Sequence, residues 1–163
     1  MSDQSAEPQA AATPQMKILG QYIRDMSFEN VMASKGMTTE AQPEIEVQVA
    51  LKAHKKSADD QYEVVQKYKI TARNKGTTDM LFLLELEYGG LFLLSGIPED
   101  KVHPIALIEC PRMLFPYVRR IVGDITRDGG FPQLNLDNVD FLKLYQQEIQ
   151  RRAKEQSANN EPV

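Results

Sequence analysis

Residues 44–53 read EIEVQVALKA, a stretch in which an apolar side chain stands at nearly every second position. Successive side chains of an extended chain point to opposite faces, so this stretch predicts a β-strand with one buried and one solvated face. The solvated side chains are Glu44, Glu46, Gln48 and Lys52. The buried face is predicted to consist of Ile45, Val47, Val49, Leu51 and Ala53.

Two more strands are predicted downstream. The polar link 54–60 (HKKSADD) is short and leads to a second alternating stretch at 62–71, so these two strands should be antiparallel neighbours. A hairpin signal at 74–76 (NKG) precedes a third strand over 80–88. In that third strand the alternation sends Phe82, Leu84 and Leu86 to one face and Leu83, Glu85 and Glu87 to the other.

The sheet is completed at both ends. The pair Gly89-Gly90 predicts a bulge or bend, after which the strand resumes at 91–94. Residues 28–33 are predicted to be a further strand, which gives a four-stranded antiparallel meander. The apolar residues between Ile18 and Phe28 favour an extended or one-turn segment that packs onto the domain.

Helices follow the strands. Apolar residues recur at helical spacing over 107–125, and several prolines in this region predict a bent helix that ends at Gly129-Gly130. A final amphipathic helix is predicted over 139–153, with Phe141, Leu142, Tyr145 and Ile149 on its apolar side. This order predicts an α+β fold in which two C-terminal helices pack on one face of the sheet.

Composition sets the organisation of the chain. Its 163 residues suit one domain, predicted at 16–153 between disordered tails at 1–15 and 154–163, which contain little apolar surface to bury. Nineteen basic against 23 acidic residues give a net charge of -4, which argues against nucleic acid as a partner. No apolar run is long enough to span a bilayer, so we expect a soluble protein that does not insert into membranes.

Candidate catalytic residues are few. Cys110, His54 and His103 could in principle supply a nucleophile and a base, but a single cysteine on an apolar helix face is more often a core residue. The histidines lack metal-ligand spacing, and the glycines form no phosphate-binding loop. The sequence therefore predicts no enzyme, no cofactor and no metal site. A small α+β hydrolase or isomerase that uses Glu85 or Cys110 remains the alternative.

Two surface features stay open to more than one interpretation. Glu85 and Glu87 share a strand face with Leu83, and Asp25 and Glu29 flank the first strand. These carboxylates could form an ordinary solvated face, an acid and base pair, or a docking site for a basic partner. The apolar surface also exceeds what one small sheet and two helices cover, which indicates an oligomer interface, a binding groove for extended chains, or both.

Four segments carry a resemblance to a known family. They are YIRDMSFEN at 22–30, QPEIEVQV at 42–49, CPRMLFPYVRR at 110–120 and GGFPQLNLDNVDF at 129–141. In these segments the chain resembles SecB, the protein-export chaperones of Gram-negative bacteria. The resemblance implies a cytoplasmic homotetramer, a dimer of dimers, that holds unfolded precursor proteins without ATP and delivers them to the motor ATPase SecA. A plain oligomeric adaptor that binds no cargo is a further alternative, beside the small enzyme.

The resemblance also implies two sites. A SecA-docking face corresponds to Asp25, Glu29, Leu83 and Glu85. A groove for unfolded precursors corresponds to Ile45, Val47 and Val49 of the alternating strand, together with Tyr145 and Ile149 of the last helix.

Overall fold

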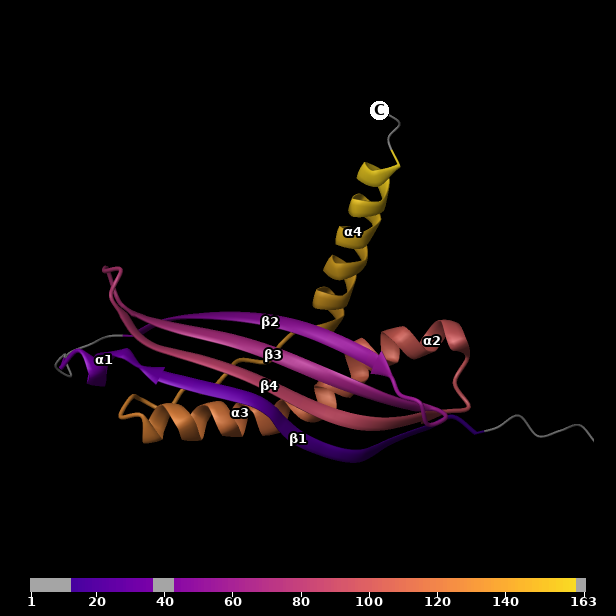
Figure 1. Ribbon diagram of the computed structural model, residues 1–163, viewed down its shortest axis with the longest axis horizontal. Helices are drawn as coiled ribbons and strands as arrows, with labels where there is room; N and C mark the ends of the chain where they lie inside the picture. Colours follow the sequence, from indigo (N-terminus) through magenta and orange to yellow (C-terminus); the bar gives the residue numbers. More distant parts are fainter. Residues whose placement is uncertain (1–12, 37–42, 161–163) are drawn as a thin grey trace, which may run out of the picture.

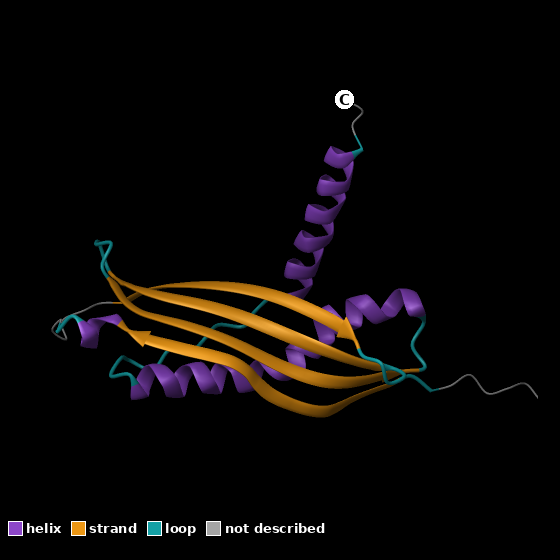
Figure 2. Cartoon of the chain, viewed as in Figure 1, coloured by secondary structure: helices purple, strands orange, loops and turns teal. Residues whose placement is uncertain are grey.

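A computed structural model describes residues 13–36 and 43–160 of the chain. Four long strands form one layer, and a helical segment lies across one face of that layer, while the last helix projects away from it (Figure 1). Figure 2 shows the same division into an antiparallel sheet and helices. The elements are β1 (Gln15–Asn30), α1 (Val31–Ser34), β2 (Pro43–Lys55), β3 (Gln61–Asn74), β4 (Met80–Ser95), α2 (Glu99–Pro104), the π-helical turn η1 (Ile105–Glu109), α3 (Cys110–Asp128) and α4 (Phe141–Asn159).

The sheet is antiparallel throughout, with the strand order β1-β4-β3-β2. The predicted α+β class and four-stranded antiparallel sheet are confirmed, and β2, β3 and β4 follow one another through short turns as expected. The simple meander is wrong, because β1 pairs with β4 and not with β2. The predicted first strand at 28–33 is also misplaced, because the strand runs from Gln15 to Asn30 and residues 31–34 form a short helix.

The sequence pattern concealed β1 for a physical reason. Two irregularities in its pairing with β4 leave Leu19 and Arg24 as extra residues on the β1 side. Each bulge shifts the alternation by one residue, so the period-two pattern that identifies a strand is broken twice. At the end of β1 the Asn30 side chain accepts a hydrogen bond from the Ala33 backbone N–H at 3.0 Å and caps α1.

The two adjacent glycines of β4 allow close approach on both faces of the sheet. A Cβ atom at Gly89 would lie 2.8 Å from the Tyr22 ring, and one at Gly90 would lie 3.0 Å from the Leu114 side chain of α3. The strand itself continues to Ser95, as predicted, and the bulges lie in β1, the strand beside it. The glycines are therefore explained by packing against neighbours rather than by a bend in their own strand.

The proline-rich region is helical from Glu99 to Asp128, and its interruption is the π-helical turn η1. Pro104 ends α2, Pro111 lies in the first turn of α3, and Pro116 lies inside α3. The predicted helix with prolines, ending at Gly129, is confirmed. Its buried face packs on the sheet, where the side chain of Gln66 donates a 2.9 Å hydrogen bond to the Pro111 carbonyl.

The hydrophobic core lies between the inner face of the sheet and α3. The alternation predicted for β4 is confirmed, because Phe82, Leu84 and Leu86 are at most 1% exposed. On β3 the same face buries Tyr68 and Ile70 completely. The largest fully buried side chains are those of Tyr68, Phe82, Phe92, Phe141, Ile70, Leu81, Leu84, Leu86, Leu114, Gln66, Val64 and Val118.

The last helix departs from the expected packing. Of its side chains only that of Phe141 is buried, so α3 packs on the sheet while α4 contacts the domain through its first turns and then projects outward (Figure 1). The helix also continues past the predicted end at Ala153 to Asn159, so most of the predicted tail 154–163 is helical. Residues 1–12 of the predicted N-terminal tail, and residues 161–163, lie outside the described part of the chain. No helix in the described ranges is long and apolar enough to cross a membrane.

Candidate binding surfaces

An apolar groove follows the inner face of β2. Ile45, Val47 and Val49 lie on this face, in register with the buried Ala72, Ile70 and Tyr68 of β3. Because β2 is the last strand of the sheet, its inner side chains are covered less than those of β3, and Val47 is 40% exposed. The predicted groove strand therefore presents apolar side chains that the domain leaves partly open.

Three cavities line up along this face, with volumes of about 180, 390 and 500 Å³. The first two share Ile45 and Leu134, and the second and third share Val49. Shared walls make them one continuous groove between β2 on one side and the connection 131–139 and α4 on the other. We call it the β2 groove. Its further apolar lining residues are Pro43, Ala50, Leu51, Tyr68, Phe82, Leu107, Phe131, Pro132, Leu134, Leu136, Val139 and Leu144. Its polar lining residues are Lys52, Gln133, Asn135, Asp137, Gln147, Glu148, Arg151 and Arg152.

Helix α3 fixes the opposite wall of the groove. The Arg119 guanidinium donates to the Leu136 carbonyl at 2.9 Å and to the Asn138 side-chain oxygen at 2.6 Å. The Thr126 hydroxyl accepts a hydrogen bond from the Leu134 backbone N–H at 3.0 Å. The stretch FPQLNLDN at 131–138 carries part of the family resemblance. Its role as a groove wall was missed, because that role depends on donors and acceptors far away in the sequence.

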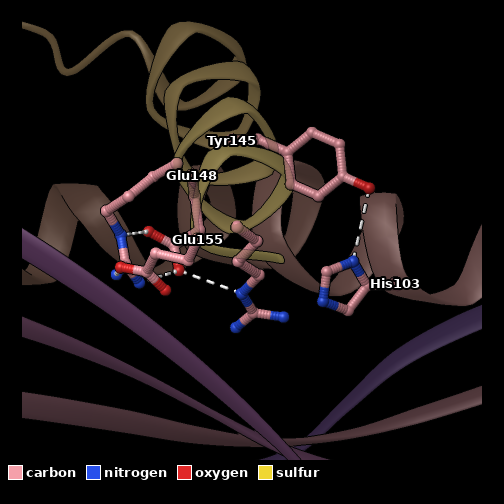
Figure 3. Close-up of polar contacts among 6 residues, drawn as sticks. His103, Tyr145, Glu148 and Glu155 are labelled. Carbon is pink, nitrogen blue, oxygen red and sulfur yellow. Dashed lines mark hydrogen bonds and ion pairs between the residues drawn. The ribbon is translucent and has the colours of Figure 1, made fainter. Parts of the chain in front are cut away.

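Helix α4 closes the wide end of the groove through Tyr145. The Tyr145 hydroxyl lies 3.3 Å from His103 Nδ1, and the two rings are 5.5 Å apart, which joins α4 to α2 (Figure 3). Burial, followed by the charge of Arg152, lowers the pKa of His103. Tyr145 lines the groove, whereas Ile149 is 44% exposed and is not among the residues that line these three cavities.

Charged residues of α4 border the same end. Glu148 accepts hydrogen bonds from Arg151 at 2.7 Å and from Arg152 at 3.1 Å, and these bonds lower its pKa (Figure 3). Arg151 also pairs with Glu155. Paired acidic and basic side chains of α4 therefore border the wide end of the groove, while its middle and narrow end are mainly apolar.

The predicted SecA-docking residues lie together on the outer face of the sheet. Glu29 of β1 is directly opposite Leu83 of β4, and Asp25 is opposite Glu87. Glu85 lies between these two pairs, opposite Ser27. The register thus brings β1 and β4 side chains into one surface, which we call the acidic stripe: Asp25, Glu29, Leu83, Glu85 and Glu87.

The acidic character does not extend over the whole outer face. On β3, Lys69 is opposite Glu85, and Lys67 is opposite Glu87 with a 3.8 Å ion pair. The two carboxylates of β4 in the stripe therefore face lysines on β3. The sequence placed these lysines outward by alternation, but only the register shows which carboxylates they face.

The proposed nucleophile and bases do not meet. Cys110 is fully buried in the core beneath the inner face, and burial raises the pKa of its thiol to about 12. His54 lies on the outer face of β2, opposite Glu63, and His103 contacts Tyr145. Glu85 lies on an open sheet face rather than in a closed pocket. The described residues therefore do not assemble the Cys110 or Glu85 sites of the enzyme alternative.

Comparison with known proteins places the chain in a family. The family model for the preprotein translocase subunit SecB matches residues 9–152. The protein-export protein SecB of Cereibacter sphaeroides is 57% identical over 162 residues, with 97% of both chains covered. That of Ruegeria sp. is 57% identical over 160 residues, covering 97% of this chain and 98% of the relative.

A solved structure shares the fold. It is a SecB-like chaperone from Mycobacterium tuberculosis in complex with a ChAD peptide from an antitoxin. The likeness has a TM-score of 0.62 at 16% sequence identity, and it covers 77% of this chain and 91% of that one. Together, the family match and the high identity over nearly the whole length show that this chain belongs to the SecB family.

Proposed function

We propose that this protein is a chaperone of protein export that binds unfolded precursor proteins in the β2 groove. The observation that carries the proposal is the continuous apolar groove, because three connected cavities run along an edge strand whose inner side chains are half exposed. Family membership supports the chaperone role and points to a protein without catalytic activity. Export from the cytoplasm is the setting in which such binding would act.

Binding in this groove needs no nucleotide. Unfolded precursors expose apolar segments, and their burial stabilises a complex by roughly 25 cal/mol per Å² before ordering costs are subtracted. The fixed wall at 131–139 lowers the ordering cost on the chaperone side, because Arg119 and Thr126 already hold it. Folded proteins bury such segments and offer nothing to the groove, so the preference for unfolded chains follows from the same physics.

We further propose a homotetramer built as a dimer of dimers. Strand β1 is an edge of the sheet, and in the described chain its outer edge pairs with no other strand. An unpaired, apolar edge is a natural site for pairing with another chain. On α3, Met113 is 37% exposed and Tyr117 is 41% exposed, so a second apolar surface is available. On β1 the exposed apolar side chains are Met16, Leu19, Tyr22, Ile23 and Met26.

Several copies of the β2 groove on one particle would raise affinity for long chains. Once one segment of a precursor is bound, the others are held at high effective concentration near the remaining grooves. Hand-over would then proceed through SecA, docked on the acidic stripe by charge complementarity. Leu83 supplies an apolar contact among the carboxylates of that stripe.

The proposal is tested by size-exclusion chromatography with light scattering, with and without a denatured precursor. We expect a particle of about four chains of 18.5 kDa that captures the precursor without ATP. A folded form of the same precursor should elute separately. A particle that never shifts on addition of the denatured precursor would contradict cargo binding and favour the adaptor, whereas a stable monomer at micromolar concentration would contradict the assembly.

A further inference from the structure

A small basic hollow lies on the outer face of the sheet, beside the acidic stripe. It has a volume of about 160 Å³ and is lined by Arg24, Ala50, Lys52, His54, Val65, Lys67 and Glu87. Three permanent cations therefore surround one carboxylate. Glu87 belongs to both features, because it lines the hollow and stands opposite Asp25 of the stripe.

The register explains why this part of the sheet is concave. Ala50 of β2 is opposite Lys67 of β3, and Lys52 is opposite the buried Val65. The short side chains of Ala50 and Val65 form the floor, and the long side chains of the two lysines rise around it. Outward-facing positions of adjacent strands thus form a shallow basin with a basic rim.

Arg24 reaches this basin because of the second bulge in β1. As the extra residue between Ile23 and Asp25, it is released from the regular alternation, and its guanidinium lies 3.6 Å from Glu63 of β3. The side chain therefore extends across β4. A bulge commonly re-aims a side chain in this way.

The cations of the hollow keep hydrogen-bonding capacity. The Arg24 and Lys67 nitrogens lie 3.9 and 3.8 Å from the Glu87 oxygens, distances that exceed a hydrogen bond. Lys52 forms no ion pair within the described ranges 13–36 and 43–160. An incoming carboxylate could accept hydrogen bonds from these donors without breaking an existing one.

We propose that the basic hollow receives a carboxylate side chain of the partner that docks on the acidic stripe. This inference rests on the proposed docking of SecA. A segment that fits both features carries basic residues for Glu85 and Glu29 and an acidic residue that reaches Lys52 and Lys67. The outer face then selects a segment by its charge pattern and fixes its register, instead of attracting any basic chain.

Neutralising a lysine of the hollow should change the affinity for SecA in opposite directions in two cases: when a partner carboxylate binds in the hollow, and when a wholly basic partner is simply attracted to the acidic stripe. For a wholly basic partner, neutralising a lysine beside the stripe would make the face more negative and strengthen binding. For a partner with a carboxylate in the hollow, the same change removes an attraction and weakens binding. Lys52→Gln and Lys67→Gln should therefore each weaken the affinity for cognate SecA by roughly 3- to 5-fold, the usual scale of a partly exposed ion pair.

The test is titration calorimetry of cognate SecA against four variants, which are Lys52→Gln, Lys67→Gln, Lys17→Gln and Glu85→Lys. Lys17 is an exposed lysine opposite Leu93, remote from the hollow in the register, so Lys17→Gln makes the same charge change and should leave affinity unaltered. Unchanged or tighter binding of Lys52→Gln and Lys67→Gln, with loss of binding in Glu85→Lys, would overturn the hollow but leave SecA docking intact. Full binding by Glu85→Lys would overturn the docking itself.

A second titration uses inorganic phosphate as the probe. Under the proposal, phosphate competes with SecA for the wild type and competes less for Lys52→Gln. If phosphate binds the wild type but SecA affinity is the same in all lysine variants, the hollow is a site for free anions and the assignment to a partner carboxylate is wrong.

Discussion

The Tyr22 hydroxyl of β1 donates a hydrogen bond to the Glu63 carboxylate of β3, across the intervening strand β4. The ring passes over Gly89, where any Cβ atom would lie 2.8 Å from it. One side chain therefore ties three strands together on the outer face. Burial and the Glu63 carboxylate raise the pKa of Tyr22 to about 12, and the Tyr22 hydrogen bond is the main cause of the lowered pKa of Glu63.

The hydrogen bond between Tyr22 and Glu63 should make the free energy of unfolding fall at alkaline pH. Because the folded pKa of Tyr22 is raised above its ordinary value of 10.0, its contribution is fully present below pH 10 and is lost as the pH rises to about 12. In urea denaturation from pH 8 to pH 12, the stability advantage of wild type over Tyr22→Phe should shrink between pH 10 and pH 12. An advantage that stays constant over this range would contradict the assigned bond.

Gly90 should tolerate substitution less well than Gly20. A Cβ atom at Gly90 would meet Leu114 of α3 at 3.0 Å and Phe92 at 2.7 Å inside the core, whereas Gly20 has nothing within 4 Å. Gly90→Ala should lower the free energy of unfolding by about 1–3 kcal/mol, the cost of overpacking. Gly20→Ala is the matched control and should stay within about 0.5 kcal/mol of wild type. Urea denaturation measures both, and equal stabilities would rule out the close approach.

The groove wall should depend on Arg119. Arg119→Gln loses the hydrogen bonds to the Leu136 carbonyl and to Asn138, which should cost about 1–3 kcal/mol of stability and weaken precursor binding, because the wall becomes looser. Arg120→Gln is the control, since Arg120 forms an exposed pair with Asp124 at 3.6 Å and no other ion pair among residues 13–36 and 43–160. Thermal unfolding and precursor affinity are measured together. Equal losses in the two variants would show that Arg119 has no special role in the wall.

The acidic stripe should govern SecA binding through charge. Glu85→Lys reverses the charge beside Leu83, and Leu83→Arg also removes the apolar contact, so both should weaken SecA binding by at least about 10-fold and spare precursor binding. The wild-type affinity should fall as salt rises, because the stripe is exposed and its attraction is screened. Calorimetry with the SecA C-terminal segment, at two salt concentrations, measures both effects. Equal affinity of wild type and Glu85→Lys would indicate that these carboxylates form an ordinary solvated face and do not bind SecA.

Regular alternation made much of the sheet predictable from sequence. The inner faces of β2 and β4 were identified correctly, because the pairing of β2 with β3 keeps one register throughout and that of β3 with β4 keeps one register from Phe82 onward. The inner face of β2 was expected to be buried, but Val47 is 40% exposed because β2 is an edge strand. Strand β1 was not predicted correctly, because bulges at Leu19 and Arg24 break its two-residue period. Its pairing with β4 also joins residues that are far apart in the sequence. Which strand pairs with β1 depends on how the folded sheet packs, and a local sequence pattern does not contain that information.

The binding surfaces were predictable only in part. The strand pattern identified Val47 as an inward residue, and the family resemblance supplied Tyr145, but the wall at 131–139 depends on hydrogen bonds from α3. The family resemblance also implied Ile149 for the groove, on the apolar side of the same helix as Tyr145. The outward course of α4 leaves it exposed, and a helical period cannot reveal the direction in which a helix leaves its domain.

The groove should lose cargo when its open side chains become polar. Replacing Val47 by Asp and Tyr145 by Gln should weaken precursor binding by at least about 10-fold, because both side chains line the β2 groove. The cost in stability of the change at Val47 should be small, since this side chain is already 40% exposed. Ile149→Gln is the control and should bind like wild type. Fluorescence titration with a denatured precursor measures the affinity of wild type, the double variant and Ile149→Gln. An unchanged affinity of the double variant would show that the β2 groove does not bind cargo.

Photo-crosslinking can locate a bound precursor on the protein, because a crosslink forms only where the two chains are in contact. A photo-reactive amino acid is placed at Val47 in one protein and at Lys69, on the outer face of β3, in another. Each is irradiated with a denatured precursor in the absence of ATP. We expect strong crosslinks from position 47 and few from position 69. Equal crosslinking from the two faces, or crosslinks mainly from position 69, would contradict the β2 groove as the site that holds unfolded proteins.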